Sequence, residues 1–164
     1  MKKVNISISD WMELVAQGKK IPVTIQLHGT SMEPLIRGWK DFVTIIPVTE
    51  KVQVGDIVLF RRKDGSYVVH RLYQIKGEWM QTWGDNCRFP DEPVPASSVL
   101  GIVCAVVKNG KNVLLNTDEQ RKKGIRWMNS KFRKKIWFFY RFWKYQAGRV
   151  LRKWQRVKQR IVNE

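Results

Sequence analysis

Hydrophobic and polar residues alternate with a period of two along much of the first 120 residues of this chain. Between residues 21 and 28 every second position is hydrophobic, which is typical of a strand with one buried face. The same pattern predicts strands over residues 42–48, 56–60, 67–75, 78–83, 100–107 and 112–115. Asp64-Gly65 and Asn109-Gly110 are typical of tight hairpin turns. The patterns therefore predict a mainly β fold, either a small coiled barrel or a pair of packed sheets.

One short amphipathic helix is predicted before the first strand, over residues 10–17. Asp10 is suited to the N-cap position, Glu13 follows three residues later, and Gly18 is placed to end the helix. The hydrophobic residues between them would face the β core.

The C-terminal residues 121–164 differ in composition from the rest of the chain. They hold 16 of the 31 Lys and Arg residues and a single acidic residue, Glu164, and ten of the nineteen aromatic residues lie between Trp127 and Trp154. The net charge of +17 therefore belongs mostly to this tail. We expect a domain over residues 1–120, large enough to support its own core, and a separate basic tail over 121–164. The domain should keep its fold without the tail.

Hydrophobic residues in the tail recur at intervals of three and four, with Lys and Arg between them. This apolar stripe comprises Phe132, Ile136, Phe139, Tyr140, Trp143, Ala147, Val150, Leu151, Trp154, Val157 and Ile161. The longest uncharged run, 136–140, is far shorter than the roughly 20 residues that span a bilayer. The pattern predicts a long basic amphipathic helix over 126–162 that lies on an anionic membrane surface. Packing of the stripe on the β domain or on a second copy, and a nucleic-acid-binding arm, are the alternatives.

Two segments supply a candidate nucleophile and a candidate base. Ser31 lies in Gly-Thr-Ser-Met-Glu-Pro and His70 lies in Val-Val-His-Arg. A serine hydroxyl needs a neighbouring group to accept its proton, and a histidine, with an ordinary pKa of roughly 6.5, is matched to that task. A carboxylate facing the other ring nitrogen would fix the tautomer. Asp85 and Asp91 are the candidates for it, although both also lie in turn-forming sequence.

These segments resemble those of the type I signal peptidases and the related self-cleaving repressor proteases. The resemblance also covers Gly-Asp-Ile-Val at 55–58, Gly-Asp-Asn at 84–86 and Val-Leu-Gly-Ile-Val at 99–103. In archaeal and endoplasmic-reticulum signal peptidases the base at the position of His70 is a histidine, whereas the bacterial enzymes and the repressors have a lysine. The chain is therefore most similar to the Ser-His group. The resemblance implies a serine endopeptidase with a coiled, mostly β fold that cleaves signal or leader peptides beside small residues.

The resemblance also implies roles for individual residues. Asp91 lies at the offset of the aspartate that orients the histidine, with Asp85 as the nearer alternative. The backbone N–H of Ser31 is the expected first donor of an oxyanion hole, since a single donor lowers the barrier by about 3 kcal/mol. Gly29 stands where many signal peptidases carry a second serine, so the second donor is open and Thr30 is a weak candidate. We assign Gly29, Thr30 and Met32 to substrate and oxyanion binding.

The remaining candidate residues are two cysteines and a second histidine. His28 is an alternative base, but we expect it to be a partly exposed strand residue near the substrate groove. Cys87 and Cys104 lack the spacing of a metal or redox motif, so we expect a free or structural pair. The sequence contains no metal-ligand cluster, phosphate-binding glycine loop or dinucleotide motif, and no metal or cofactor is expected.

The N-terminal residues bear on where in the cell the protein is located. Two lysines are present, but no apolar stretch of signal-peptide length follows them, nor an anchor of the kind that signal peptidases carry. We expect a cytoplasmic peptidase held at the inner membrane face by its tail. The alternative is a non-catalytic module of the peptidase fold that binds a membrane or nucleic acid. A self-cleaving repressor is less favoured, since no helix-turn-helix precedes Ser31 and the base is not lysine.

Overall fold

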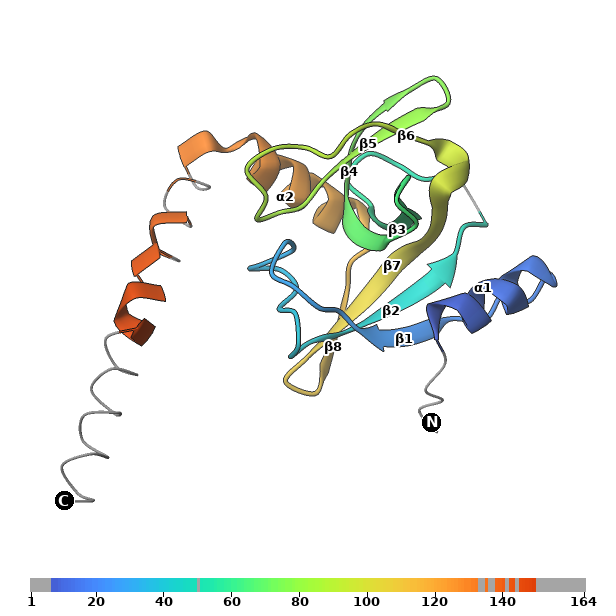
Figure 1. Cartoon of the computed structure of the whole chain (residues 1–164), viewed down its shortest axis with the longest axis horizontal. Coiled ribbons are helices and arrows are strands. Elements are labelled where there is room, and N and C mark those ends of the chain that lie inside the picture. Colours follow the sequence, from blue (N-terminus) through green and yellow to red (C-terminus); the bar gives the residue numbers. More distant parts are fainter. Residues whose placement is uncertain are drawn as a thin grey trace, which may run out of the picture. The chain divides into compact units, whose positions relative to one another are not determined.

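The computed structural model describes residues 7–49, 51–132, 135, 138–140, 142, 143 and 145–149. Contacts divide the chain into two units, Met1–Met128 and Asn129–Glu164. The first unit contains a single antiparallel sheet (Figure 1). Its strands are β1 (Val23–Gln26), β2 (Phe42–Pro47), β3 (Ile57–Arg61), β4 (Tyr67–Lys76), β5 (Trp79–Trp83), β6 (Val94–Pro95), β7 (Val99–Lys108) and β8 (Lys111–Leu114).

The strands follow the order β1-β2-β7-β3-β4-β5-β6, and β8 extends β7 as a hairpin. The register shifts within the β2–β7, β3–β7 and β4–β5 pairs, and such bulges bend strands and increase their twist. The sheet accordingly curls into a half-barrel (Figure 1). The predicted mainly β fold is confirmed, as is the hairpin at Asn109-Gly110, where both residues have positive φ and match a type I′ turn.

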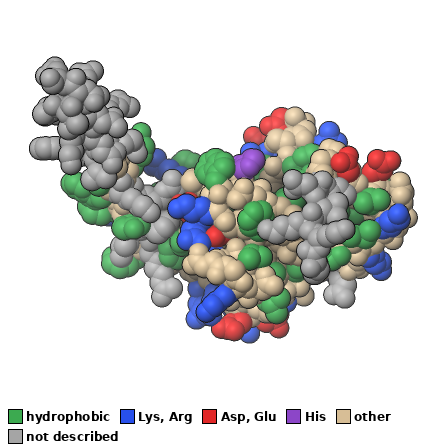
Figure 2. Space-filling view, turned by 90° about the horizontal axis from the view of Figure 1, so that it is seen from below, with side chains coloured by type: hydrophobic (Ala, Val, Ile, Leu, Met, Phe, Trp, Pro, Cys, Tyr) green, Lys and Arg blue, Asp and Glu red, His purple; other side chains and the backbone are tan. Residues whose placement is uncertain are grey.

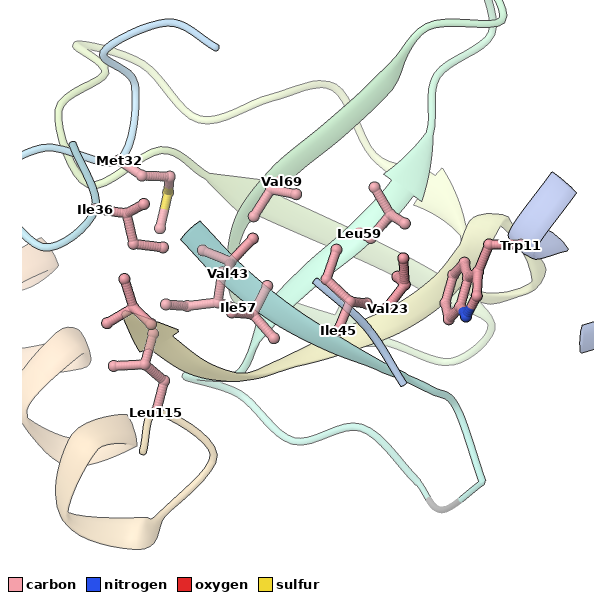
Figure 3. Packing of buried hydrophobic residues seen from close by; sticks show 12 residues of the cluster. Trp11, Val23, Met32, Ile36, Val43, Ile45, Ile57, Leu59, Val69 and Leu115 are labelled. Carbon is pink, nitrogen blue, oxygen red and sulfur yellow. The ribbon is translucent and has the colours of Figure 1, made fainter. Parts of the chain in front are cut away.

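Strand β3 lies at the centre of the sheet and is buried on both faces. Ile57 and Leu59 belong to one hydrophobic cluster, while Val58 and Phe60 belong to another, as expected from the alternation of side chains along a strand. Figure 3 shows the first cluster extending from Trp11 to the neighbourhood of Met32 and Leu115. The residue after the candidate nucleophile is therefore part of the core, which anchors the Ser31 loop.

Helix α1 (Ile8–Ala16) begins before the predicted helix over 10–17. Its N-cap is Ser7, whose hydroxyl accepts a hydrogen bond from the Asp10 N–H at 3.1 Å, so the assignment of Asp10 as the cap is wrong. Both residues can cap a helix, and Ile8 extends the apolar face by one turn. Gly18 ends the helix as predicted, with φ of 81°. The Trp11 side chain is fully buried and donates to the Ile21 carbonyl at 2.7 Å.

Helix α2 (Asp118–Asn129) was not predicted as part of the β domain. It packs on the domain through the buried residues Gly124 and Met128, and the Trp127 indole donates to the Asp85 carbonyl at 3.0 Å. Arg121 forms an ion pair with Asp56 at 2.9 Å. The first unit therefore extends to Met128 and includes most of α2, whereas the predicted domain ended at residue 120. That the domain keeps its fold without residues 121–164 stays a prediction.

The predicted continuous helix over 126–162 is not supported. Helix α2 ends at Asn129 and Ser130 is not helical, while residues 150–162 lie outside the described residues. Seven aromatic residues beyond α2 are more than a third exposed: Phe132, Phe138, Phe139, Tyr140, Phe142, Trp143 and Tyr145. None of the described helices is both long and apolar enough to cross a bilayer. On the face shown in Figure 2, hydrophobic side chains are scattered among charged and other polar groups.

Candidate active site

The Ser31 segment is a tight loop that follows β1 and returns to β2. Gly29 has φ of 88°, a conformation that favours glycine. A Cβ on Gly38 would lie 1.8 Å from the Gly29 carbonyl oxygen, so the two ends of the loop can approach only because residue 38 lacks a side chain. The Trp39 N–H donates to the Leu27 carbonyl at 2.8 Å and closes the loop. Its position is thus fixed by backbone packing.

The turn over residues 84–87 joins the Ser31 loop to the sheet. The Asn86 N–H donates to the Ser31 carbonyl at 2.7 Å, and the Asn86 side-chain amide donates to the Thr30 carbonyl at 2.8 Å. A Cβ on Gly84 would lie 2.9 Å from the Ser31 carbonyl oxygen and 3.0 Å from His70 Nε2. Only glycine therefore fits at position 84 without moving the Ser31 carbonyl or the imidazole.

His70 lies in β4, and its imidazole is held by Asp91. The Nδ1 atom is 2.5 Å from Asp91 Oδ2, and the His70 side chain is 5% exposed. When Nδ1 carries the proton and donates it to the carboxylate, Nε2 is left as the acceptor. This is the orientation that a general base requires.

Asp91 is itself fixed on both its backbone and its carboxylate. Its N–H donates to the Thr82 carbonyl at 2.8 Å, and its carbonyl accepts from the Gln81 amide at 2.9 Å. The Thr82 hydroxyl donates to Oδ2 at 2.8 Å and Arg62 Nη2 donates to Oδ1 at 2.5 Å. Burial alone would raise the pKa of Asp91, but the hydrogen bonds from His70, Thr82 and Arg62 lower it overall. The carboxylate is thus kept ionised.

The pKa of His70 is raised. Burial disfavours the imidazolium, but the hydrogen bond and charge of Asp91, followed by the proximity of Cys87, outweigh burial and raise the pKa of His70 to about 9. At neutral pH the imidazole therefore holds a proton on both nitrogens in the unliganded protein. It becomes able to accept a proton as the pH rises toward 9.

Asp85 lies in a different environment from Asp91. Its carboxylate accepts two hydrogen bonds from the Arg71 guanidinium, at 2.8 and 2.7 Å, and both side chains are almost fully buried. Arg71 also donates to the Gly55 carbonyl at 2.9 Å. A Cβ on Gly124 of α2 would lie 2.2 Å from Arg71 Nη1. The Asp85–Arg71 pair therefore joins the 84–87 turn to β4 and α2, and among the described residues no hydrogen bond joins the Asp85 carboxylate to the His70 imidazole.

Ser31 and His70 line the same cleft, which has a volume of about 610 Å³. Its lining includes residues 25–29, from the end of β1 into the following loop, and residues 67–70 of β4. Met32 also lines the cleft although it is only 3% exposed. Within the described part of the chain, no hydrogen bond joins the Ser31 hydroxyl to His70. The Ser31–His70 dyad is thus a prediction that the shared cleft supports.

His28 is an exposed residue on the rim of this cleft. Its ring stacks on the Trp39 indole, with centroids 6.1 Å apart and an interplanar angle of 13°. The Trp39 side chain is 59% exposed and its φ of 60° is unusual for a residue with a side chain. An exposed ring stacked on an exposed indole suits substrate contact better than proton transfer.

Some residues that shape the site were missed by the sequence reasoning. Arg62 and Thr82 hold Asp91, and Gly84 and Asn86 position the Ser31 loop. A short glycine-containing turn before Asp91 was visible in the sequence, but the partners of its amides depend on the curl of the sheet. Among the described residues, no three His, Cys, Asp or Glu side chains are grouped as metal ligands. Both cysteines are free and partly exposed.

Comparison with known protein families identifies the fold. Residues 8–120 match the model of the Peptidase S24-like family, which is more than half of the chain. The protein therefore belongs to the Peptidase S24-like family and has a serine-type peptidase fold. No curated protein matches the chain.

Proposed function

We propose that this protein is a serine endopeptidase in which Ser31 is the nucleophile and His70 the general base. The observation that carries the proposal is the hydrogen bond between His70 Nδ1 and Asp91 Oδ2 at 2.5 Å. It leaves Nε2 as the nitrogen of a buried imidazole that could accept a proton, and Ser31 and His70 line one cleft, which supports the proposal. Membership of a peptidase family supports the reaction class, and the histidine base follows the archaeal and endoplasmic-reticulum signal peptidases that the motifs resemble.

The reaction follows from the positions of these groups. Neutral His70 accepts the Ser31 proton at Nε2 while Oγ attacks the carbonyl carbon of the substrate. Asp91 stabilises the imidazolium that forms, and the Ser31 N–H donates to the developing oxyanion. The imidazolium then protonates the leaving amine, and water hydrolyses the acyl-enzyme by the same route. Asp91 acts through His70, so it is a positioning residue.

The substrate is proposed to bind as an extended segment between β1 and β4. Among the described strands, β1 pairs only with β2, so its other edge is available to an added strand. The cleft is lined by residues 25–29, which include the end of β1, and by Ser31. Signal or leader peptides cleaved beside small residues are the proposed substrates, by resemblance to the signal peptidases.

We further propose that the tail holds the enzyme at an anionic membrane surface, on the cytoplasmic side. The seven exposed aromatic residues of the second unit favour this location, since aromatic rings suit the headgroup boundary. The surrounding Lys and Arg residues would supply electrostatic attraction to anionic lipid. Nucleic-acid binding would draw on the same charge but makes less use of the aromatic rings.

The test of the proposed activity is cleavage of a leader-peptide library by the full-length protein at pH 7 and pH 9, with products identified by mass spectrometry. Ser31→Ala should abolish every cleavage that the wild type performs. Ser97→Ala, which changes an exposed serine in a short helix remote from the cleft, is the matched control. Folded wild type that yields no Ser31-dependent product at either pH would overturn the proposal.

A further inference from the structure

Cys87 is a nucleophilic group in the cleft that the proposed reaction does not use. It lines the same cleft as Ser31 and His70. A Cβ on Gly84 would lie 2.6 Å from Cys87 Sγ and 3.0 Å from His70 Nε2. Because both distances start from the same point, Cys87 Sγ and His70 Nε2 can be no farther apart than the sum of the two. The thiol therefore lies next to the imidazole nitrogen that would accept the Ser31 proton.

The position of the thiol is set by the turn around it. The Cys87 N–H donates to the Gly84 carbonyl at 2.9 Å, and its carbonyl accepts from the Trp83 indole at 3.0 Å. The backbone is thus held at both ends, and the partly exposed side chain faces the cleft. His70 Nδ1 is already engaged by Asp91, so Nε2 is the nitrogen available to Cys87.

Cysteine nucleophiles are activated by a neighbouring histidine that is itself held by a carboxylate. Cys87, His70 and Asp91 have this arrangement. Cys104 provides the contrast within the same chain. Its Sγ donates to the Thr44 carbonyl at 3.4 Å, and burial raises its pKa. Both thiols are partly exposed, but only Cys87 has an imidazole next to it.

We infer that Cys87 is a covalent modification site for small soft electrophiles, namely alkylating agents and disulfides. With iodoacetamide, His70 holds the thiol proton, the sulfur forms a bond to carbon, and the carbon–iodine bond breaks as iodide leaves with its electron pair. With a small disulfide, Cys87 sulfur bonds to one sulfur and the other leaves as a thiolate. Either adduct would occupy the cleft at His70 and inactivate the peptidase, a consequence that rests on the proposed function.

The modification is tested by treating the full-length protein with iodoacetamide at pH 7 and following each cysteine by mass spectrometry. Cys87 should react about tenfold or more faster than Cys104. His70→Gln should slow Cys87 by a similar factor and leave the rate at Cys104 unchanged. Equal rates at the two cysteines, or a Cys87 rate that ignores His70→Gln, would overturn the inference. This result does not depend on peptide cleavage, so it stands apart from the proposed function.

Inactivation is tested with hydroxyethyl disulfide. Cleavage should fall in proportion to the adduct at Cys87 and return when dithiothreitol removes it. In Cys104→Ser the loss should be the same, whereas in Cys87→Ala the cleavage rate, whatever its level, should no longer respond to the disulfide. Full activity in protein modified at Cys87 would overturn the claim that the adduct blocks the site.

Discussion

His70 Nδ1 lies 2.5 Å from Asp91 Oδ2, while Asp85 pairs with Arg71 in the protein interior. The two aspartates were alternatives for the same role, and the structure gives them different surroundings. One holds an imidazole at the edge of a cleft and the other holds a turn against β4 and α2. This separation makes the contributions of the two carboxylates to activity and stability experimentally distinct.

Ser31→Ala and His70→Ala should each lower cleavage by about a thousandfold or more, and the double variant should lose no more than either single variant. The two side chains act as one unit, because an unassisted hydroxyl is a poor nucleophile and an imidazole without Ser31 has nothing to activate. Steady-state rates for the four proteins give the comparison, with Ser97→Ala, at an exposed position that does not line the cleft, as the control. Additive losses would show that the residues do not act in one step.

Asp91→Asn should lower turnover by orders of magnitude, since the loss falls on the orientation of His70, and its effect on stability should be confined to the pH range below about 9 in which His70 is protonated. Asp85→Asn should instead lower the free energy of unfolding by about 3 kcal/mol, because it leaves the buried Arg71 without its charge partner. Glu92→Gln changes an exposed neighbouring acid and is the control. Denaturant unfolding and turnover, measured on all three, decide the assignment. The reverse pattern would transfer the orienting role to Asp85.

The value of kcat/KM should rise with pH and level off above about 9, where His70 loses its extra proton. Asp91→Asn should move this rise in kcat/KM to lower pH, because the carboxylate that raises the pKa of His70 is gone. The raised pKa of His70 also stabilises the folded protein. This contribution to the free energy of unfolding is complete below the ordinary pKa of 6.5 and is lost as pH rises through about 9.

The loss should appear as a fall in the free energy of unfolding between those pH values. In His70→Gln the free energy of unfolding should fall less over this pH range, because the glutamine side chain has no proton to lose. A kcat/KM profile that is already level at pH 7, or a stability profile identical in His70→Gln, would contradict the raised pKa.

Gly124→Ala should destabilise the protein, because its Cβ would lie 2.2 Å from Arg71 Nη1 and one of the two must move. Met128→Ala should cost about 2–5 kcal/mol through the cavity it leaves. Lys122→Ala, an exposed position on the same helix, should change stability by less than about 0.5 kcal/mol. Thermal unfolding gives the comparison. Equal behaviour of the three variants would show that α2 does not contribute to the fold.

The β fold was predictable because alternation and turn residues are local signals. The strand at 42–48 and the hairpin at Asn109-Gly110 needed no information from distant residues. The predicted start of helix α1 was too late in the sequence, because Ser7 and Asp10 can each cap a helix and the choice between them depends on packing. Helix α2 was assigned to the tail because its charge resembles that of the tail. Its buried positions are a glycine and a methionine, which give little hydrophobic pattern.

The candidate site was predictable as residue types but not as contacts. Ser31, His70 and Asp91 could be proposed from their motifs, whereas Arg62 and Thr82 come to Asp91 only through the curl of the sheet. The proximity of Cys87 to His70 was equally hidden. It depends on the absence of a side chain at Gly84, and a glycine in a turn does not reveal which atoms pack around it.

The tail should bind anionic vesicles through its exposed aromatic residues as well as its charge. Phe139 is 64% and Trp143 57% exposed, and their rings lie 6.0 Å apart. Each ring can add apolar transfer energy at the lipid interface, while Lys and Arg add a salt-sensitive part. Co-sedimentation should therefore fall with salt but not vanish.

The double variant Phe139→Ser with Trp143→Ser should weaken the binding that persists at high salt. Trp79→Ser, which changes an exposed tryptophan of the first unit, is the control. Full-length protein that ignores anionic vesicles at low salt, or that binds nucleic acid instead with a steep salt dependence, would contradict the membrane role.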